Sequence, residues 1–246
     1  QNNNGVIGGL KKVDAEIARD FYKSFCKGEI SLTDSKTAEL VKLTENTYRD
    51  INIAFANELS IISDHLNVDI RKLIKLSNRH PRVNILQPGC GVGGHCIPVD
   101  PYYMMQRAAD VGVPAELITA ARAVNRTMPL HVAGVLNQLL YKAGVPAGEG
   151  RVLLLGWSYK AEVGDPRETP AEPLTEALQN KEIAVAAYDP HLNSGDFPEG
   201  VEVVSDIDSA EGYDLAVLVT AHKSCVNIDW AGLAKRMRNP IIYDGR

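Results

Sequence analysis

The last part of the chain, from residue 151 onward, alternates short apolar runs with helical patterns, and this alternation constrains the fold more than any other feature. Apolar runs occupy residues 152–155, 183–188, 201–204, 215–219 and 241–243, and residues 169–180 have helical spacing. Continuous apolar runs are typical of parallel strands covered on both faces, and right-handed helical crossovers join such strands. We therefore predict an α/β, Rossmann-like domain whose ligand binds at the carboxyl ends of its strands.

The first turn of this predicted sheet departs from the usual dinucleotide pattern. After the first run the chain continues Gly156-Trp157-Ser158-Tyr159-Lys160 rather than G-x-G-x-x-G. This weakens a standard dinucleotide site but is compatible with another nucleotide. Lys160 and Arg167 are candidate partners for its phosphates.

The middle of the chain is predicted to be helical. Apolar residues recur every three or four positions over residues 35–66 and 115–143, where Pro129 predicts a kink, and shorter helices are expected at 69–77 and 100–111. The first of these helices would be about 45 Å long, a length that commonly spans domains or forms an oligomer interface. Lys42, Asn46 and Arg49 share one of its faces, although a solvated polar stripe is the simpler interpretation.

The first residues have the pattern of the end of an α/β unit. Residues 6–9 form a short apolar run, a helix with Asp14 as its cap and Gly28 as its stop is expected next, and residues 29–33 can form an edge strand. The chain begins without Met, so we expect an upstream domain to be missing. We divide the chain into a remnant at 1–33, a helical central domain at 34–150 and the Rossmann-like domain at 151–246.

The composition excludes several classes of partner. The formal net charge of −5 at pH 7 argues against nucleic acid, and no apolar run reaches the roughly 18 residues that a membrane span needs. There is no signal-peptide pattern, and four cysteines that are not closely paired fit a reducing compartment. We expect a cytoplasmic protein with no nucleic-acid or membrane partner.

Residues 87–100 are predicted to form a functional loop. The run contains four glycines and two prolines around Cys90, His95, Cys96 and Asp100, which excludes a helix or a central strand. A basic turn over residues 78–82 precedes it and suits an anion as well as it suits open solvent.

Cys96 has four possible interpretations. A buried, inert thiol is the default for a lone cysteine. A zinc site built from Cys90, His95 and Cys96 would need adjacent side chains to converge on one ion, and there is no second C-x-x-C, so we expect no metal. A Cys-His hydrolase would place the histidine across from the thiol rather than beside it. The fourth interpretation is a nucleophile activated by a nearby cation such as Lys42.

Three motifs in order resemble the nucleotide-sugar 6-dehydrogenases. They are Lys42-Leu43-Thr44-Glu45-Asn46, then Gly91-Val92-Gly93-Gly94-His95-Cys96-Ile97-Pro98-Val99-Asp100, then Lys160 with Asp165-Pro166-Arg167-Glu168-Thr169-Pro170. The resemblance covers nearly the whole chain. Residues 78–89 are most similar to the branch that acts on UDP-N-acetyl-mannosamine.

The resemblance implies an NAD-dependent oxidation of a sugar C6 alcohol to a carboxylate. Cys96 would be the nucleophile that forms a thiohemiacetal and then a thioester. Lys42 and Asn46 would stabilise the oxyanion, Lys42 could also transfer protons, and Asp100 would orient water or relay protons during hydrolysis. His95 is expected to be a bystander, and the loop glycines are expected to make room for the substrate.

The resemblance also implies binding roles and an assembly. Residues 151–246 would be the UDP-sugar-binding domain, and the central domain would form a homodimer through the long helix. In such enzymes the turn with His80 and Arg82 can reach the neighbouring subunit's site. Arg167 would contact NAD, and the expected substrate contacts are Arg49, His80, Arg82, Gly93, Tyr159, Lys160 and Arg246.

Two departures from the family pattern shape the prediction. The amino-terminal NAD-binding Rossmann domain is not represented, apart from the remnant at 1–33, so we expect the chain alone to bind UDP-sugar at most weakly and not to turn over. Val99 stands where relatives often have Lys beside the cofactor. The alternatives are a dehydrogenase for UDP-glucose or for UDP-N-acetyl-galactosamine or -glucosamine, and a noncatalytic UDP-sugar-binding or dimerisation module.

Overall fold

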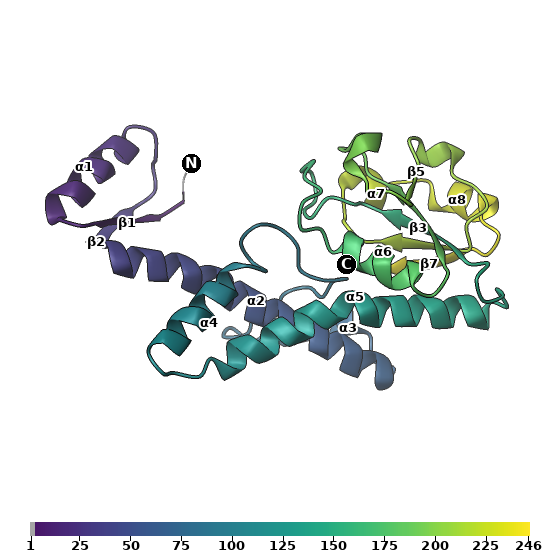
Figure 1. Cartoon of the computed structure of the whole chain (residues 1–246), viewed down its shortest axis with the longest axis horizontal. Coiled ribbons are helices and arrows are strands. Elements are labelled where there is room, and N and C mark those ends of the chain that lie inside the picture. Colours follow the sequence, from purple (N-terminus) through teal and green to yellow (C-terminus); the bar gives the residue numbers. More distant parts are fainter. Residues whose placement is uncertain (1–2) are drawn as a thin grey trace. The chain divides into compact units, whose positions relative to one another are not determined.

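The computed structural model describes residues 3–246, which divide into two compact units (Figure 1). Each unit is built from two stretches of chain. The first unit consists of the described residues up to Arg49 together with Val99–Ala115, and the second consists of Asp50–Pro98 and Glu116–Arg246. Helix α2 (Ser35–His65) contributes its first half to one unit and its second half to the other. Its predicted length is confirmed.

The first unit begins with a parallel pair of strands joined by a helix. β1 (Gly5–Gly9) pairs with β2 (Ile30–Asp34), and α1 (Lys12–Lys23) connects them. The prediction that Asp14 caps α1 was wrong. Lys11 is the N-cap residue, and the Asp14 carboxylate accepts the Lys11 backbone N–H from inside the first turn at 2.9 Å. The helix also ends at Lys23, before Gly28, and Ser24 is its C-cap.

The remaining helices of the middle segment begin close to their predicted positions. α3 (Ile70–Ser77) is capped by the Asp69 side chain. α4 (Asp100–Asp110), in the first unit, has Val99 as its N-cap, so Asp100 is already helical. α5 (Glu116–Lys142) continues through Pro129 as one helix. Among the described residues, no helix is both long enough and apolar enough to cross a membrane.

The second unit contains the predicted parallel sheet. Its order is β5 (Glu202–Val203), β4 (Ala184–Tyr188), β3 (Arg151–Leu155), β6 (Leu215–Leu218) and β7 (Ile241–Asp244). Val152 is opposite Val185 on one side and Leu215 on the other. This order confirms a Rossmann-like arrangement, in which the first and fourth strands of the domain are neighbours and their crossovers diverge.

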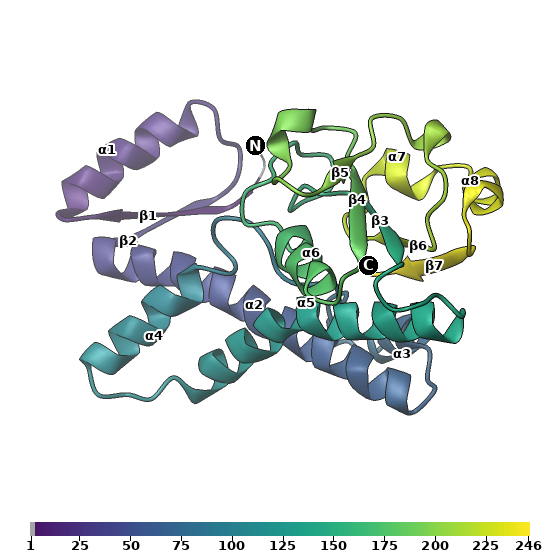
Figure 2. The ribbon, with the colours of Figure 1, turned by 45° about the vertical axis from the view of Figure 1, so that its right-hand side comes forward.

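Helices cover both faces of the sheet (Figure 2). Along β3, Val152 and Leu154 pack with α5 and α6 (Ala171–Gln179), whereas Leu153 and Leu155 pack with α7 (Lys223–Val226) and α8 (Trp230–Arg236). These four side chains are fully buried, and burial of one such residue contributes about 2 kcal/mol. α7, α8 and the 3₁₀ turns Ser194–Asp196 and Ile207–Ser209 were not foreseen.

Candidate functional site

Three predicted catalytic residues form one hydrogen-bonded chain in the first unit. The Asn46 side chain is 4% exposed, and its Oδ1 accepts from Lys42 Nζ at 3.4 Å. Its Nδ2 donates to Asp100 Oδ2 at 2.5 Å. Asn46 therefore has a fixed amide orientation and connects an amine on one helix turn to a carboxylate at the start of α4. Arg49 is exposed on the same helix.

Cys96 belongs to the second unit and is the exposed thiol of the glycine-rich loop. The other cysteine of that loop, Cys90, is 1% exposed and lies 3.8 Å from the carbonyl oxygen of Gly245. Burial raises the pKa of the Cys90 thiol to about 12, so it forms almost no thiolate at neutral pH. Chemistry that needs a thiolate in this loop must therefore use Cys96.

The start of the loop is fixed by a buried chain of amides. The Gly89 N–H donates to Asn57 Oδ1 at 2.9 Å, and Asn57 Nδ2 donates to Asn125 Oδ1 at 2.9 Å. Asn125 Nδ2 donates in turn to Asp50 Oδ1 at 2.8 Å, which also accepts from Arg122 at 2.5 Å. Carboxylate oxygens only accept, so Asn125 must turn its NH2 group toward Asp50 and its oxygen toward Asn57. Asn57 is oriented in the same way, with its oxygen toward the Gly89 N–H. Burial raises the pKa of Asp50, and Arg122 opposes this effect.

The end of the loop is tied to the segment that follows β3. His95 Nε2 lies 3.0 Å from Asp165 Oδ2, and the Gly94 N–H donates to the Glu168 carbonyl oxygen at 3.0 Å. Arg167 binds the Asp165 carboxylate through two nitrogens, at 2.9 and 2.8 Å. Hydrogen bonds from Arg167 and then His95 hold the pKa of Asp165 well below its usual range.

Two loop glycines are required by the contact with this same segment. A Cβ at Gly93 would lie 2.5 Å from the Glu168 carbonyl oxygen, and one at Gly94, where φ is +95°, would lie 2.8 Å from the Tyr159 ring. Only glycine allows so close an approach, and at Gly94 the positive φ is a second reason for it. These glycines therefore let the loop lie directly against the protein's own chain, a contact that the sequence did not predict.

The carboxyl edge of the sheet is organised by Asp189, which follows β4. Its carboxylate accepts the backbone N–H groups of Trp157 and Ser158 at 2.8 and 2.7 Å, and it lies 3.0 Å from His222 Nε2. Burial opposes ionisation of Asp189, but the bonds from His222 and the backbone outweigh it and hold its pKa well below the usual range. Nearby, Gly156 has φ of +86°, and a Cβ there would lie 2.3 Å from the Thr220 carbonyl oxygen.

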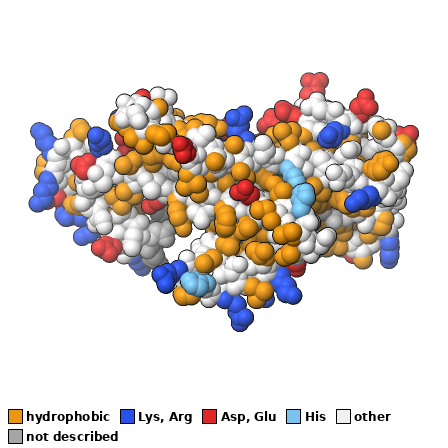
Figure 3. Space-filling view, turned by 90° about the horizontal axis from the view of Figure 1, so that it is seen from below, with side chains coloured by type: hydrophobic (Ala, Val, Ile, Leu, Met, Phe, Trp, Pro, Cys, Tyr) orange, Lys and Arg blue, Asp and Glu red, His pale blue; other side chains and the backbone are white. Residues whose placement is uncertain are grey.

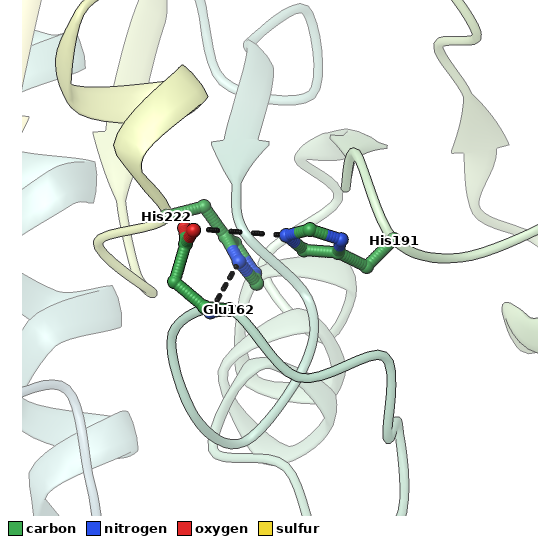
Figure 4. Close-up of side chains that lie close together, drawn as sticks. All are labelled: Glu162, His191 and His222. Atoms are coloured by element: carbon green, nitrogen blue, oxygen red, sulfur yellow. Dashed lines mark hydrogen bonds and ion pairs between the residues drawn. The ribbon is translucent and has the colours of Figure 1, made fainter.

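Glu162, His191 and His222 converge beside this edge, with possible ligand atoms within 4.8 Å of one another (Figure 4). His222 Nδ1 accepts the Glu162 backbone N–H at 3.0 Å, so the ring proton is on Nε2, which donates to Asp189. Both nitrogens of this fully buried ring are thus engaged. The Glu162 carboxylate also accepts the Lys223 N–H at 2.7 Å. These contacts make the group a clamp between loops rather than an open set of ligands.

The other predicted binding residues fall in three places: the segment after β3, the turn after α3, and the last residue of the sequence, Arg246. Tyr159 is half-buried and Lys160 is exposed in the segment after β3. His80 and Arg82 are exposed in the turn after α3, where the Arg82 N–H donates to His80 Nδ1 at 3.3 Å.

Arg246 lies beside the start of the glycine-rich loop. A Cβ at Gly89 would be 3.1 Å from the Arg246 guanidinium, and Arg71 donates to the Arg246 carbonyl oxygen at 2.6 Å. Arg71 also pairs with Asp244 at 2.5 Å. The structure thus brings Cys96, Tyr159, Arg167 and Arg246 to the same loop system of the second unit, and Lys42, Asn46 and Asp100 to one cluster in the first.

The groups that hold this loop were not predicted from the sequence. Asp50 and Asn57 are seven positions apart on α2, so they share a helix face, and this spacing was the available signal for the buried chain. Asp165 was noted only as part of a motif, and His95 was set aside.

The fold and the site define a Rossmann-type α/β unit with an exposed cysteine in a loop whose preceding residues, Gly94 and His95, are bonded to the segment after β3. The chain belongs to the UDP-glucose/GDP-mannose dehydrogenase family. Residues 36–127 match the central domain of that family, and residues 153–246 match its UDP binding domain.

Known relatives agree with this assignment. The UDP-N-acetyl-D-mannosamine dehydrogenase of Methanococcus vannielii is 42% identical over 98% of this chain and 55% of the relative. A solved structure of UDP-D-ManNAc dehydrogenase from Pyrococcus horikoshii has a TM-score of 0.89 and 40% identity, over all of this chain and 56% of that one. An NDP-N-acetyl-D-galactosaminuronic acid dehydrogenase from Ralstonia nicotianae is 38% identical over 99% of this chain and 56% of the relative. The chain spans about half the length of the curated relatives it matches.

Proposed function

We propose that this chain is the nucleophile-bearing and UDP-sugar-binding part of an NAD-dependent dehydrogenase that oxidises C6 of UDP-N-acetyl-D-mannosamine. One observation carries the proposal. The exposed Cys96 lies in a loop bonded to the segment that opens the domain matching UDP binding. The names of relatives about 40% identical support the sugar. The division at residues 33 and 150, and a cytoplasmic location, are parts of the same proposal.

The described residues of this chain do not by themselves form a dinucleotide site. In the part that the structure describes, no strand leads through a G-x-G-x-x-G turn into a helix, and the guanidinium of Arg167, the proposed cofactor contact, is bound to Asp165. Arg167, whose side chain is 72% exposed, is therefore the only contact with the dinucleotide that we propose among the described residues.

The proposed chemistry of this chain begins with Cys96. Its thiolate adds to the C6 carbonyl carbon of the aldehyde, a C–S bond forms, and the carbonyl oxygen becomes an oxyanion. Lys42 and Asn46 supply the cation and the amide that stabilise such a charge. The aldehyde and, later, the thioester each arise by loss of a hydride from C6, and bound NAD would supply this two-electron oxidation as the hydride acceptor. Water then attacks the thioester carbon, Asp100 takes a proton from that water, and the Cys96 thiolate leaves.

Two alternatives remain, and the first has a specific basis. Relatives named as NDP-N-acetyl-D-galactosaminuronic acid dehydrogenases are 38% identical, so a sibling sugar, UDP-glucose or an N-acetyl-hexosamine epimer, is the runner-up. A noncatalytic binding or dimerisation module is the second. A panel of UDP-sugars separates the siblings, and substitution of Cys96 separates an enzyme from a module.

The central test uses a fusion in which the amino-terminal half of the Pyrococcus horikoshii relative precedes this chain. We expect NADH formation with UDP-N-acetyl-D-mannosamine, loss of acid product in Cys96→Ser, and retained activity in the matched control Cys26→Ser. Full acid formation by Cys96→Ser would exclude the proposed nucleophile. The chain alone should bind UDP in a calorimetric titration and reduce no NAD.

We also propose a homodimer through the long central helix. Large hydrophobic side chains are exposed along α2 and α5, among them Phe55, Ile62, Leu130 and Tyr141. Figure 3 shows hydrophobic side chains gathered on one face, and gathered apolar surface is typical of an interface. A monomer in equilibrium sedimentation at micromolar concentration would contradict the dimer.

A further inference from the structure

We propose that His95 is a positioning residue that couples nucleotide binding on the segment after β3 to the placement of Cys96. The inference rests on the proposed function, because it takes the nucleotide to be the UDP part of the substrate. It replaces the expectation that His95 is a bystander.

His95 is the residue next to the proposed nucleophile and has defined contacts. Its Nε2 lies 3.0 Å from Asp165 Oδ2, and its ring makes a T-shaped contact with the Tyr159 ring, with centroids 5.7 Å apart. The side chain is 41% exposed, so burial alone does not fix it. The bond to Asp165 and the contact with Tyr159 set its direction.

The partner segment is itself rigidly built. The Tyr159 N–H donates to the Asp165 carbonyl oxygen at 3.1 Å, which closes a turn, and Arg167 clamps the Asp165 carboxylate through two hydrogen bonds. At its root, Trp157 and Ser158 donate to the buried Asp189. His95 is therefore bonded to a rigid segment, residues 157–168, which is itself bonded to the end of the sheet. We call this segment the platform.

The same platform is where a ligand of this sheet binds. Ligands of open parallel sheets bind beyond the carboxyl ends of the strands, next to the switch point between β3 and β6. Tyr159 stands four residues after the end of β3 and packs on both Gly94 and His95. A nucleotide that orders Tyr159 and Asp165 consequently orders His95, and with it Cys96.

The coupling has a measurable size. Coupling between two sites typically changes affinity by about 5- to 150-fold. The Gly94–Glu168 backbone bond survives any side-chain change at His95, so the lower end of that range is expected here. Loss of His95 should weaken the coupling and spare the fold.

The test measures hydrogen exchange of residues 89–98 and the rate of Cys96 alkylation by iodoacetamide, resolved by peptide mass spectrometry, in the full chain with and without UDP. In the unsubstituted chain, UDP should slow both by at least about fivefold. In His95→Ala and Asp165→Asn, UDP should still bind in calorimetry but should slow both by less than in the unsubstituted chain, since the Gly94–Glu168 backbone bond remains. His95→Gln keeps an amide donor for Asp165 and should restore the effect.

His65→Ala is the matched control, since His65 is an exposed histidine of the same unit whose ring bonds to the Ile61 carbonyl oxygen. It should behave like the unsubstituted chain. Equal slowing by UDP in the unsubstituted chain and in His95→Ala would overturn the inference alone, as would an equal loss in His65→Ala. Failure of UDP to bind the unsubstituted chain would remove the proposed function and this inference with it.

Discussion

The two ends of the glycine-rich loop are held by opposite kinds of contact. At Gly89 the partner is Asn57, which is fully buried and belongs to the amide chain that ends on Asp50. At His95 the partner is Asp165, and the histidine side chain is 41% exposed. Groups freed by breaking a buried bond have no water to replace it, whereas water readily replaces an exposed partner. The first end is therefore a fixed anchor, and the second is an adjustable one.

The two cysteines of the loop should show the largest contrast. Burial raises the pKa of Cys90 to about 12, which at pH 8 reduces its thiolate by about a thousandfold relative to an ordinary thiol of pKa about 8.5. Iodoacetamide should alkylate the exposed Cys96 at least about a hundredfold faster than Cys90, as followed by peptide mass spectrometry. Comparable rates in the folded chain would show that the start of the loop opens freely, contrary to a fixed anchor.

Asp50→Ala tests the foundation of the buried anchor. It removes the carboxylate that pairs with Arg122, whose side chain is 7% exposed. Breaking a buried ion pair from one side lowers the free energy of unfolding by about 4 kcal/mol, measurable in urea titrations. Glu58→Ala, at an exposed site on the same helix, is the control and should change stability by less than about 0.5 kcal/mol. Equal effects of the two substitutions would argue against the anchor.

Asn57→Ala breaks the anchor at the loop itself. The Gly89 N–H loses its acceptor while it is still buried, so the free energy of unfolding should fall by about 2 kcal/mol. Hydrogen exchange at Gly89 should accelerate more than exchange at Gly94. Unchanged exchange at Gly89 would mean that Asn57 does not hold the loop.

Asp165→Asn should have the smallest effect on stability, below about 1 kcal/mol at pH 7. The bonds that Asp165 accepts from His95 and Arg167 are near the surface, where water can replace them. Arg167 and His95 hold the pKa of Asp165 below its unfolded value of about 3.9. The stabilisation is therefore present above that value and is lost as pH falls toward the folded pKa. Urea titrations of the variant and the unsubstituted chain should differ at pH 7, and the difference should begin to shrink as the pH falls below about 4. A difference that grows in acid would contradict the assignment.

The sequence predicted the elements far better than the contacts between them. Apolar periodicity located α2, α5 and the five strands of the second unit because period and run length are local properties. It missed α8, whose seven residues offer a short pattern. It misplaced the cap of α1, because an acidic residue in the first turn also binds the cap backbone from inside the helix.

The site was predictable only where a residue type has its own chemistry. Cys96 could be separated from Cys90 by resemblance, and the spacing of Lys42 and Asn46 placed them together. The bond from Asn125 to Asp50 joins positions 75 residues apart, and no local pattern encodes it. The bond from His95 to Asp165 was not predicted either, because adjacency to a thiol in the sequence does not fix the direction of an imidazole side chain.

Because the glycine-rich loop is bonded at both ends, it should be less susceptible to proteolysis than its exposure suggests. Irregular, exposed segments are usual cleavage sites, and residues 87–98 lack helix or strand structure until the turn at their end. A protease needs a stretch of chain that can leave the surface, and this loop is held at both Gly89 and His95. A protease could therefore cut the loop only after one of these two ends had detached. The loop should accordingly be cleaved later than other exposed segments of the folded chain.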